Sequence, residues 1–284
     1  MSMLVKLAGE QGVSLPLLMI GRQIVPVLVI LAWLAAHGGL ARLQTARMSG
    51  HVARSAIGMI GMVCTFGAAM LLPLPEATTL GFTAPLFAVL IGSLVLHEHI
   101  GHWRWAAVIL GFAGVVVIAQ PGGHPLPLLG ALAGLGSGLV VSIVSYLIRD
   151  LGRTEEAASI VFYFSLYGTL IALALLPLVP FRLPDLWQLT LLLGLGLSGT
   201  IGQLMMTASL RRGAIVSVIV MDYSSLIWAT GYGLIVWGNV PPITTWLGAP
   251  LIVAAGMIIA WREHRLVRKA SPLTAAAPIQ TAPD

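Results

Sequence analysis

The sequence predicts an all-α integral membrane protein, and three observations predict this class: the composition, the long apolar runs and the placement of the basic residues. The 284 residues are 58% hydrophobic and only 9% charged, with a mean hydropathy of +0.96. Soluble domains carry about 25% charged residues, so this chain has too few to cover a water-facing surface. The high hydropathy also excludes a disordered chain.

Apolar runs long enough to cross a bilayer as helices recur along the whole chain. A helical span needs about 20 apolar residues. Strands of an outer-membrane barrel would alternate apolar and polar residues in segments of about ten, whereas these runs are continuous. We therefore expect nine complete helical spans, at residues 15–36, 52–72, 77–96, 103–119, 126–148, 157–179, 186–208, 214–237 and 243–261.

The basic residues gather in alternate loops, which predicts the orientation. Cytoplasmic loops of membrane proteins carry an excess of Lys and Arg. With the C-terminus in the cytoplasm, Lys6 and Arg182 lie outside, Arg22 lies within a span, and all other basic residues lie inside. This distribution explains the net positive charge without a nucleic-acid partner. The inside residues are Arg42, Arg47, Arg54, Arg104, Arg149, Arg153, Arg211, Arg212, Arg262, Arg265, Arg268 and Lys269.

Two windows of the chain indicate an internal repeat. Residues 82–98 align with 223–239 at an offset of 141, with aromatic, hydroxyl and glycine positions in register. Residues 2–10 align with 145–153 at an offset of 143. Duplicated halves are how many transporters build a central site, so the repeat predicts two structurally related halves.

Each half would hold five helices. The span at 126–148 has a counterpart that would begin before Met1, so residues 1–8 are expected to be only its last turns. An odd number of helices per half makes the repeat an inverted one. We expect a ten-helix plan with a truncated first helix, with halves at 1–121 and 122–263 and a disordered cytoplasmic tail at 264–284.

Three segments carry a family resemblance: residues 72–118, the FYFSL segment at 162–166, and residues 221–241. With these segments the chain resembles the ten-helix, EamA-type branch of the drug/metabolite transporter superfamily. The resemblance implies a secondary transporter that moves small organic metabolites or drugs across the bacterial cytoplasmic membrane by alternating access. It implies a small-molecule substrate within a lipid bilayer and no cofactor.

The family pattern around the fourth helix is matched in part. Glu76, Thr83, Pro85 and Glu98 match it, whereas His97 stands where Gly is usual. In the second half, Gly238 matches and Asn239 replaces a Glu.

Asp222 is the most informative single position. It lies about eight residues into the span at 214–237, or about 12 Å along a helix. Intramembrane acids usually face a polar cavity and pair with another group. Asp222 either binds a cationic substrate or a coupled proton in a cavity, or it accepts hydrogen bonds from backbone where the helix is locally broken.

Arg22 and Pro85 have structural interpretations beside functional ones. Arg22 lies about 10 Å along its span, and we expect its side chain to extend to the outer interface as an anchor rather than to bind an anion. Pro85 follows Thr83 in mid-span, where proline bends a helix. Broken helices at matching positions in two halves indicate a binding site.

Further cavity candidates come from the resemblance, which places polar and aromatic groups of several spans along the solute path. The alternative for each aromatic is interhelical packing. These candidates are Tyr146, Tyr223, Trp228, Phe66, Thr65 and Gln203.

Two motifs resemble known functional motifs, but their spacing or their surroundings do not fit those functions. HEHIGH at 97–102 is not H-E-x-x-H, because residue 101 is Gly, so we expect no metal site. GLGLSG at 194–199 lies within an apolar helix, where close helix packing explains it better than dinucleotide binding. No catalytic residues are expected. The alternatives to a transporter are a membrane-embedded enzyme acting on lipid or isoprenoid substrates and a non-transporting structural subunit.

Overall fold

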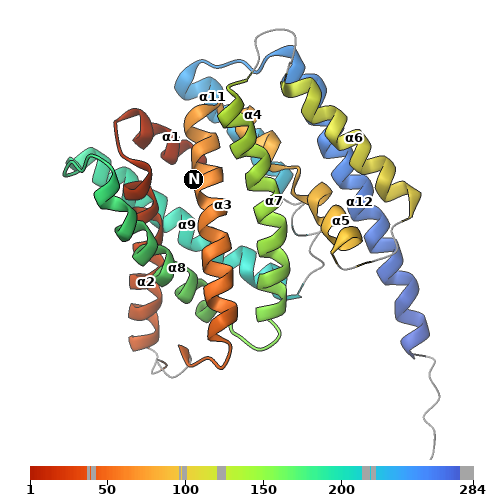
Figure 1. Cartoon of the computed structure of the whole chain (residues 1–284), viewed down its shortest axis with the longest axis horizontal. Helices are drawn as coiled ribbons and strands as arrows, with labels where there is room; N and C mark the ends of the chain where they lie inside the picture. The colour runs from red at the N-terminus through yellow and green to blue at the C-terminus, as the bar shows by residue number, and fades with distance from the viewer. Residues whose placement is uncertain are drawn as a thin grey trace, which may run out of the picture.

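The computed structural model describes residues 1–36, 39, 43–95, 97, 101–119, 126–212, 218 and 222–275, which fold into a bundle of helices (Figure 1). Within these residues every regular element is helical. The elements are α1 (Ser2–Glu10), α2 (Leu15–Ala36), α3 (Met48–Leu71), α4 (Leu74–Gly81), α5 (Ala84–Leu94), α6 (His102–Ala119), α7 (Leu128–Leu151), α8 (Ala157–Leu175), η2 (Leu176–Leu178), α9 (Leu186–Arg212), η3 (Asp222–Ser224), α11 (Ser225–Trp237) and α12 (Ile243–Ala275).

Eight helical segments are long and apolar enough to cross a membrane, which confirms an all-α membrane protein. They correspond to eight of the nine expected spans, and α4 and α5 together make one of them. The ninth expected span, 214–237, lies partly outside the described residues. Its second part forms η3 and α11.

The helix boundaries repeat along the chain, as an internal duplication requires. Helices α1 and α7 end 141 residues apart, at Glu10 and Leu151. The same separation relates the ends of α3 and α9, the starts of α5 and α11, and the starts of α6 and α12. The repeat therefore extends from sequence to the positions at which helices begin and end.

Two left-handed residues occupy equivalent positions of the repeat. Gly238 follows α11 with φ 64°, and the amide of Asn239 donates to the carbonyl of Gly233 at 3.0 Å. His97, 141 residues earlier, has φ 52°. This conformation is unfavourable for residues other than glycine, which explains why a glycine is the expected residue at both places.

Contacts between helices follow the same symmetry. Two pairs of repeat-related helices contact each other: α2 with α8, and α6 with α12. The contact of α3 with α7 has its counterpart in that of α9 with α1. Figure 1 shows α6 and α12 side by side at the right of the bundle, with α2 and α8 at the left. The two halves thus interlock as an inverted repeat.

The contact of α6 with α12 is made backbone to backbone. A Cβ atom at Gly114 would lie 2.7 Å from the carbonyl oxygen of Gly248, and one at Gly248 would lie 2.6 Å from that of Gly114. Membrane helices associate through such close approaches of small residues, because lipid provides no hydrophobic driving force between them.

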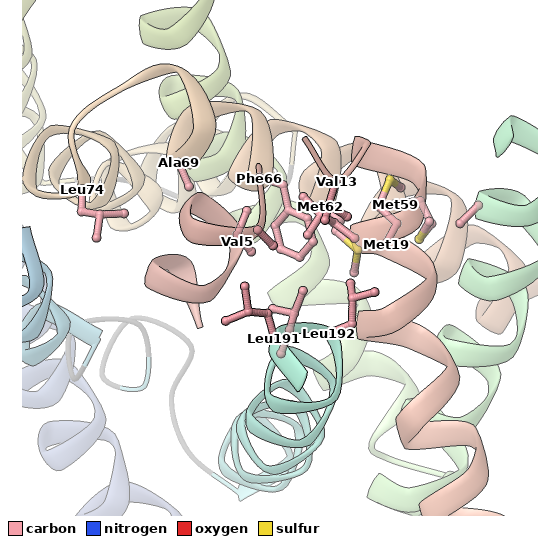
Figure 2. Close-up of a cluster of buried hydrophobic side chains, with 14 of the residues drawn as sticks. Val5, Val13, Met19, Met59, Met62, Phe66, Ala69, Leu74, Leu191 and Leu192 are labelled. Atoms are coloured by element: carbon pink, nitrogen blue, oxygen red, sulfur yellow. The ribbon is translucent and has the colours of Figure 1, made fainter. Parts of the chain in front are cut away.

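An apolar cluster joins both halves near one end of the bundle. Figure 2 shows Val5 of α1, Met19 of α2, Phe66 of α3 and Leu191 of α9 converging on one another. In contrast, many large apolar side chains point outward, and Ile109 of α6 is 69% exposed. Such outward apolar groups suit a surface that faces lipid.

The C-terminal segment differs from the expected tail. Helix α12 continues to Ala275 and so includes residues 264–275, which we expected to be disordered. Residues 261–270 contain neither glycine nor proline, and the Arg265 guanidinium lies 4.1 Å from the ring centroid of Trp261 one turn earlier. This contact favours continued helix. Residues 276–284 lie outside the described residues.

Candidate functional site

The fourth span is broken in its middle. Helix α4 ends at Gly81 and α5 begins at Ala84, and the Thr83 hydroxyl donates to the carbonyl of Leu80 at 2.7 Å. Pro85 stands in the first turn of α5, where its missing N–H removes no intrahelical hydrogen bond. Thr83 and Pro85 therefore make the break that the sequence predicts.

In the second half, the counterpart of this break is a short 3-10 helix that precedes α11. The short helix η3 runs from Asp222 to Ser224, and α11 begins at Ser225, 141 residues after the start of α5. Asp222 is exposed and lies on the break itself. Broken helices at matching positions of two repeats indicate a solute site.

A cavity of about 280 Å³ lies where the two breaks meet, and we call it the central cavity. Both halves contribute to its wall: α3, α4 and Phe82 from the first, and α7, η3 and α11 from the second. Its hydroxyl and carboxyl groups come from Ser2, Thr65, Thr78, Ser137, Asp222, Ser225 and Tyr232. Trp228 adds an aromatic surface, so the cavity offers both apolar and polar contacts to a small solute.

Four of the residues expected to line a cavity line neither the central cavity nor the smaller cavity that adjoins it. Tyr146 donates to the carbonyl of Ala88 at 3.2 Å, and Tyr223 packs edge-on against Phe82 with ring centroids 4.7 Å apart. Thr83 and Pro85 are buried at the helix break. Tyr146 and Tyr223 therefore make contacts between elements, as in the packing alternative.

A second cavity, of about 110 Å³, adjoins the first, because Thr65 and Val141 line both. We call it the arginine cavity, since Arg22 and Arg54 contribute to its wall. Phe66, Phe164 and Gln203 are among its other residues. The expected residues Arg22, Phe66, Thr65 and Gln203 are therefore brought together here.

Arg22 does not extend to the interface, so the interpretation as an outer anchor is wrong. The residue is 2% exposed, and its Nη1 donates to Oε1 of Gln23 at 3.1 Å. Gly199 of α9 makes room for it, because a Cβ atom there would lie 2.8 Å from the guanidinium carbon. A glycine on the facing helix thus lets the side chain remain inside the bundle.

Arg54 was counted with the basic residues on the inside, and it lies three residues into the expected span 52–72. Helix α3 begins at Met48, so Arg54 lies in its second turn and is 2% exposed. Its Nη2 donates to Oε1 of Gln203 at 3.2 Å, and its guanidinium lies 3.7 Å from the ring centroid of Phe164. The signal that could have found it is a single charge within an apolar run.

At the end of the bundle near the start of α3, polar contacts tie the two halves together. The Thr45 hydroxyl donates to Oε1 of Glu155 at 2.7 Å. Arg47 forms an ion pair with Asp150, and its Nη1 also donates to the carbonyl of Asp150 at 3.0 Å. These four residues, which we call the end network, connect the α2–α3 segment with the α7–α8 segment.

Of the two other motifs found in the sequence, the structure explains GLGLSG and describes HEHIGH only in part. Gly196 and Gly199 of the GLGLSG segment pack against α2, where a Cβ atom at Gly196 would lie 2.6 Å from the carbonyl oxygen of Gly21. Close packing therefore explains these glycines. In the HEHIGH segment, Glu98 and His99 lie outside the described residues.

Comparisons with known proteins identify a family and several relatives. Residues 2–120 and 128–261 match the EamA-like transporter family. A pseudopaline exporter of Pseudomonas aeruginosa is 31% identical over 208 residues, 71% of each chain. A riboflavin transporter of Vibrio cholerae is 28% identical over 253 residues, 86% of this chain and 82% of that one. A solved crystal structure, 21% identical, has a TM-score of 0.65 and covers 93% of this chain and 96% of its own.

Proposed function

Because the chain belongs to the EamA-like transporter family and is a multi-pass membrane transporter, we propose that it moves a small organic solute through the central cavity by alternating access. The observation that carries this proposal is that the break between α4 and α5 and its counterpart at η3 meet at one cavity. Each half supplies one wall, so a rocking motion of the halves would open the cavity to one side and close it to the other.

The chain would act in the bacterial cytoplasmic membrane with its C-terminus in the cytoplasm. The concentration of Arg and Lys in alternate loops supports this orientation. The organisation as halves at 1–121 and 122–263 supports a motion of one half against the other. In this orientation the end network lies at the cytoplasmic end, where it would hold the halves together until that side opens.

Asp222 would carry the coupled proton or contact a cationic group of the solute. Its carboxyl lies on the helix break and lines the central cavity, so both water and solute can reach it. A proton or substrate gradient would supply the energy, since the sequence contains no Walker A loop. Trp228 would supply an apolar surface for the rest of the solute.

The relatives support a metabolite as the solute. The similar proteins include an exporter of pseudopaline and a transporter of riboflavin. Both names denote small molecules, and both proteins are transporters, so we propose that this chain moves its solute without making or breaking covalent bonds.

The test uses the purified protein in liposomes. A thermal-shift screen against a metabolite panel first identifies a solute, since ligand binding raises apparent stability. Transport of that solute is then measured against an imposed pH gradient in the wild type and in Asp222→Asn. We expect Asp222→Asn to lose the dependence on the gradient and most of the transport.

Asp185→Asn is the matched control. Asp185 precedes α9 and its Oδ1 accepts from the amide of Gln188 at 2.7 Å, a cap that Asn also provides. This variant removes the same charge outside both cavities and should transport like the wild type. Normal, gradient-dependent transport by Asp222→Asn would remove Asp222 from the mechanism.

A further inference from the structure

Two guanidinium groups are buried at the arginine cavity without an acidic partner. Arg22 and Arg54 are each 2% exposed, and both line this cavity. Among the residues that the structure describes, no carboxylate lies within ion-pair distance of either group, whereas the exposed Arg47 has Asp150. Intramembrane charges normally pair with an opposite charge or mark a substrate path.

The neutral contacts of the two arginines leave donors unused. Arg22 donates to Gln23, and Arg54 donates to Gln203 and stacks on Phe164. Within the described part of the chain, the Nε of Arg22 and the Nε and Nη1 of Arg54 are buried and have no hydrogen-bond partner. A buried charge with unsatisfied donors is unfavourable unless a counter-charge supplies acceptors.

We propose that the arginine cavity binds the oxyanion group, carboxylate or phosphate, of the transported solute, which is therefore a small organic anion. The inference rests on the proposed transport function and names its substrate class. Arginine suits the task because its planar guanidinium donates in parallel to two oxygens of a carboxylate or phosphate. An anion would also relieve the repulsion between two cations that line one cavity.

The size and position of the cavity fit such a group. Its volume of about 110 Å³ exceeds the roughly 10–15 Å³ that one water needs. Thr65 and Val141 belong to both cavity walls, so a solute whose oxyanion sits at Arg22 and Arg54 can extend into the central cavity toward Trp228. Phe66 and Phe164 give the arginine cavity an aromatic wall, which suits an aryl anion as a probe.

The test measures binding to the detergent-purified full chain by thermal shift and calorimetry. The probes are benzoate, phenyl phosphate and benzamide, the last being a neutral analogue of benzoate. We expect benzoate or phenyl phosphate to raise the apparent Tm and benzamide to leave it unchanged. Comparison of the two anions shows whether carboxylate or phosphate is preferred.

Substitutions locate the site. Arg22→Gln and Arg54→Gln should each weaken binding of the preferred anion by about tenfold or more, because a charge-assisted hydrogen bond is lost. Arg54→Lys keeps the charge and should retain part of the binding. Arg153→Gln is the matched control, because Arg153 is exposed and lies outside both cavities.

A labelling measurement on the wild type keeps the proposal testable if a variant does not fold. Phenylglyoxal modifies arginine, and the preferred anion should protect Arg22 and Arg54 but not Arg153, as read by peptide mass spectrometry. Equal effects of benzoate, phenyl phosphate and benzamide, or binding unaffected by both Gln substitutions, would overturn the anion site. If the anion site is overturned but the protein transports a neutral or cationic solute in a manner that depends on Asp222, the proposed transport function still holds.

Discussion

The contact between α6 and α12 gives the sharpest prediction about stability. In Gly114→Ala the new Cβ would meet the backbone oxygen of Gly248 at 2.7 Å, and side-chain atoms of Leu251 and Ile252 at 3.0 and 2.9 Å. Ordinary contact begins at 3.4 Å. A backbone atom cannot rotate away, so the two helices must separate.

The cost follows from the packing that this separation removes. A gap of about 0.5–1 Å forfeits a quarter to a half of the dispersion energy of the atoms that it parts, and overpacking typically costs about 1–3 kcal/mol. Each kcal/mol lowers Tm by about 2–4 °C for a chain of this size class. We therefore expect a loss of several degrees.

Gly67→Ala on α3 is the control that separates the cost of the close contact from the effect of alanine on helix propensity. A Cβ there would meet only Ala133, at 3.9 Å, and both substitutions gain the same helix propensity. The apparent Tm of each variant is measured by thermal unfolding in detergent. An equal Tm for Gly114→Ala and Gly67→Ala would refute the close contact of α6 with α12.

The reciprocal substitution adds a coupling test. Gly248→Ala alone should cost about as much as Gly114→Ala, because its Cβ would lie 2.6 Å from the Gly114 oxygen. The same separation of the helices accommodates both methyl groups, so the double variant should lose less than the sum of the two single losses. Full additivity would show that the two sites act independently.

Two further predictions concern the helix ends. His97→Gly should raise the free energy of unfolding by about 0.5–1 kcal/mol, because the strain of a non-glycine residue in the left-handed region exceeds the entropy cost of glycine. Gly238→His should lower the free energy of unfolding for the same reason. Equal unfolding temperatures for the two variants would contradict this prediction. Replacing Arg47 and Asp150 together by Ala should change Tm little, because their side chains are 36% and 53% exposed. The same double variant should increase access of a water-soluble label to the central cavity from the cytoplasmic side, and unchanged labelling would remove the pair from gating.

The fold follows from sequence features that are local and strong. Continuous apolar runs specify helices in a membrane, because every backbone group must be satisfied within the segment. The break at Thr83–Pro85 was predictable because proline within a helix removes a hydrogen bond and bends or breaks the helix. The offset of 141 residues, found from the window at 82–98, recurs in the helix boundaries.

The residues that line the cavities were harder to predict from the sequence than the helices were. The expected span began at residue 52 and put Arg54 at its edge, whereas α3 begins at Met48, six residues before Arg54. Whether Tyr146 and Tyr223 face a cavity or a neighbouring helix depends on helix rotation, which a uniformly apolar run does not specify. Arg22 stays inside because Gly199, far away in sequence, leaves it space.

Accessibility of the central cavity from the two sides of the membrane tests alternating access most directly. Cys64→Ser removes the single cysteine of the chain, and Trp228→Cys then places one thiol in the cavity wall, with Ile109→Cys as a control on the outward surface of α6. An impermeant thiol reagent is applied to either side of oriented liposomes, with and without a transported solute. Alternating access predicts that the Trp228→Cys protein is labelled from both sides, that solute changes the ratio of the two rates, and that Ile109→Cys is unaffected by solute. Labelling from one side only, at a rate that solute does not alter, would contradict it.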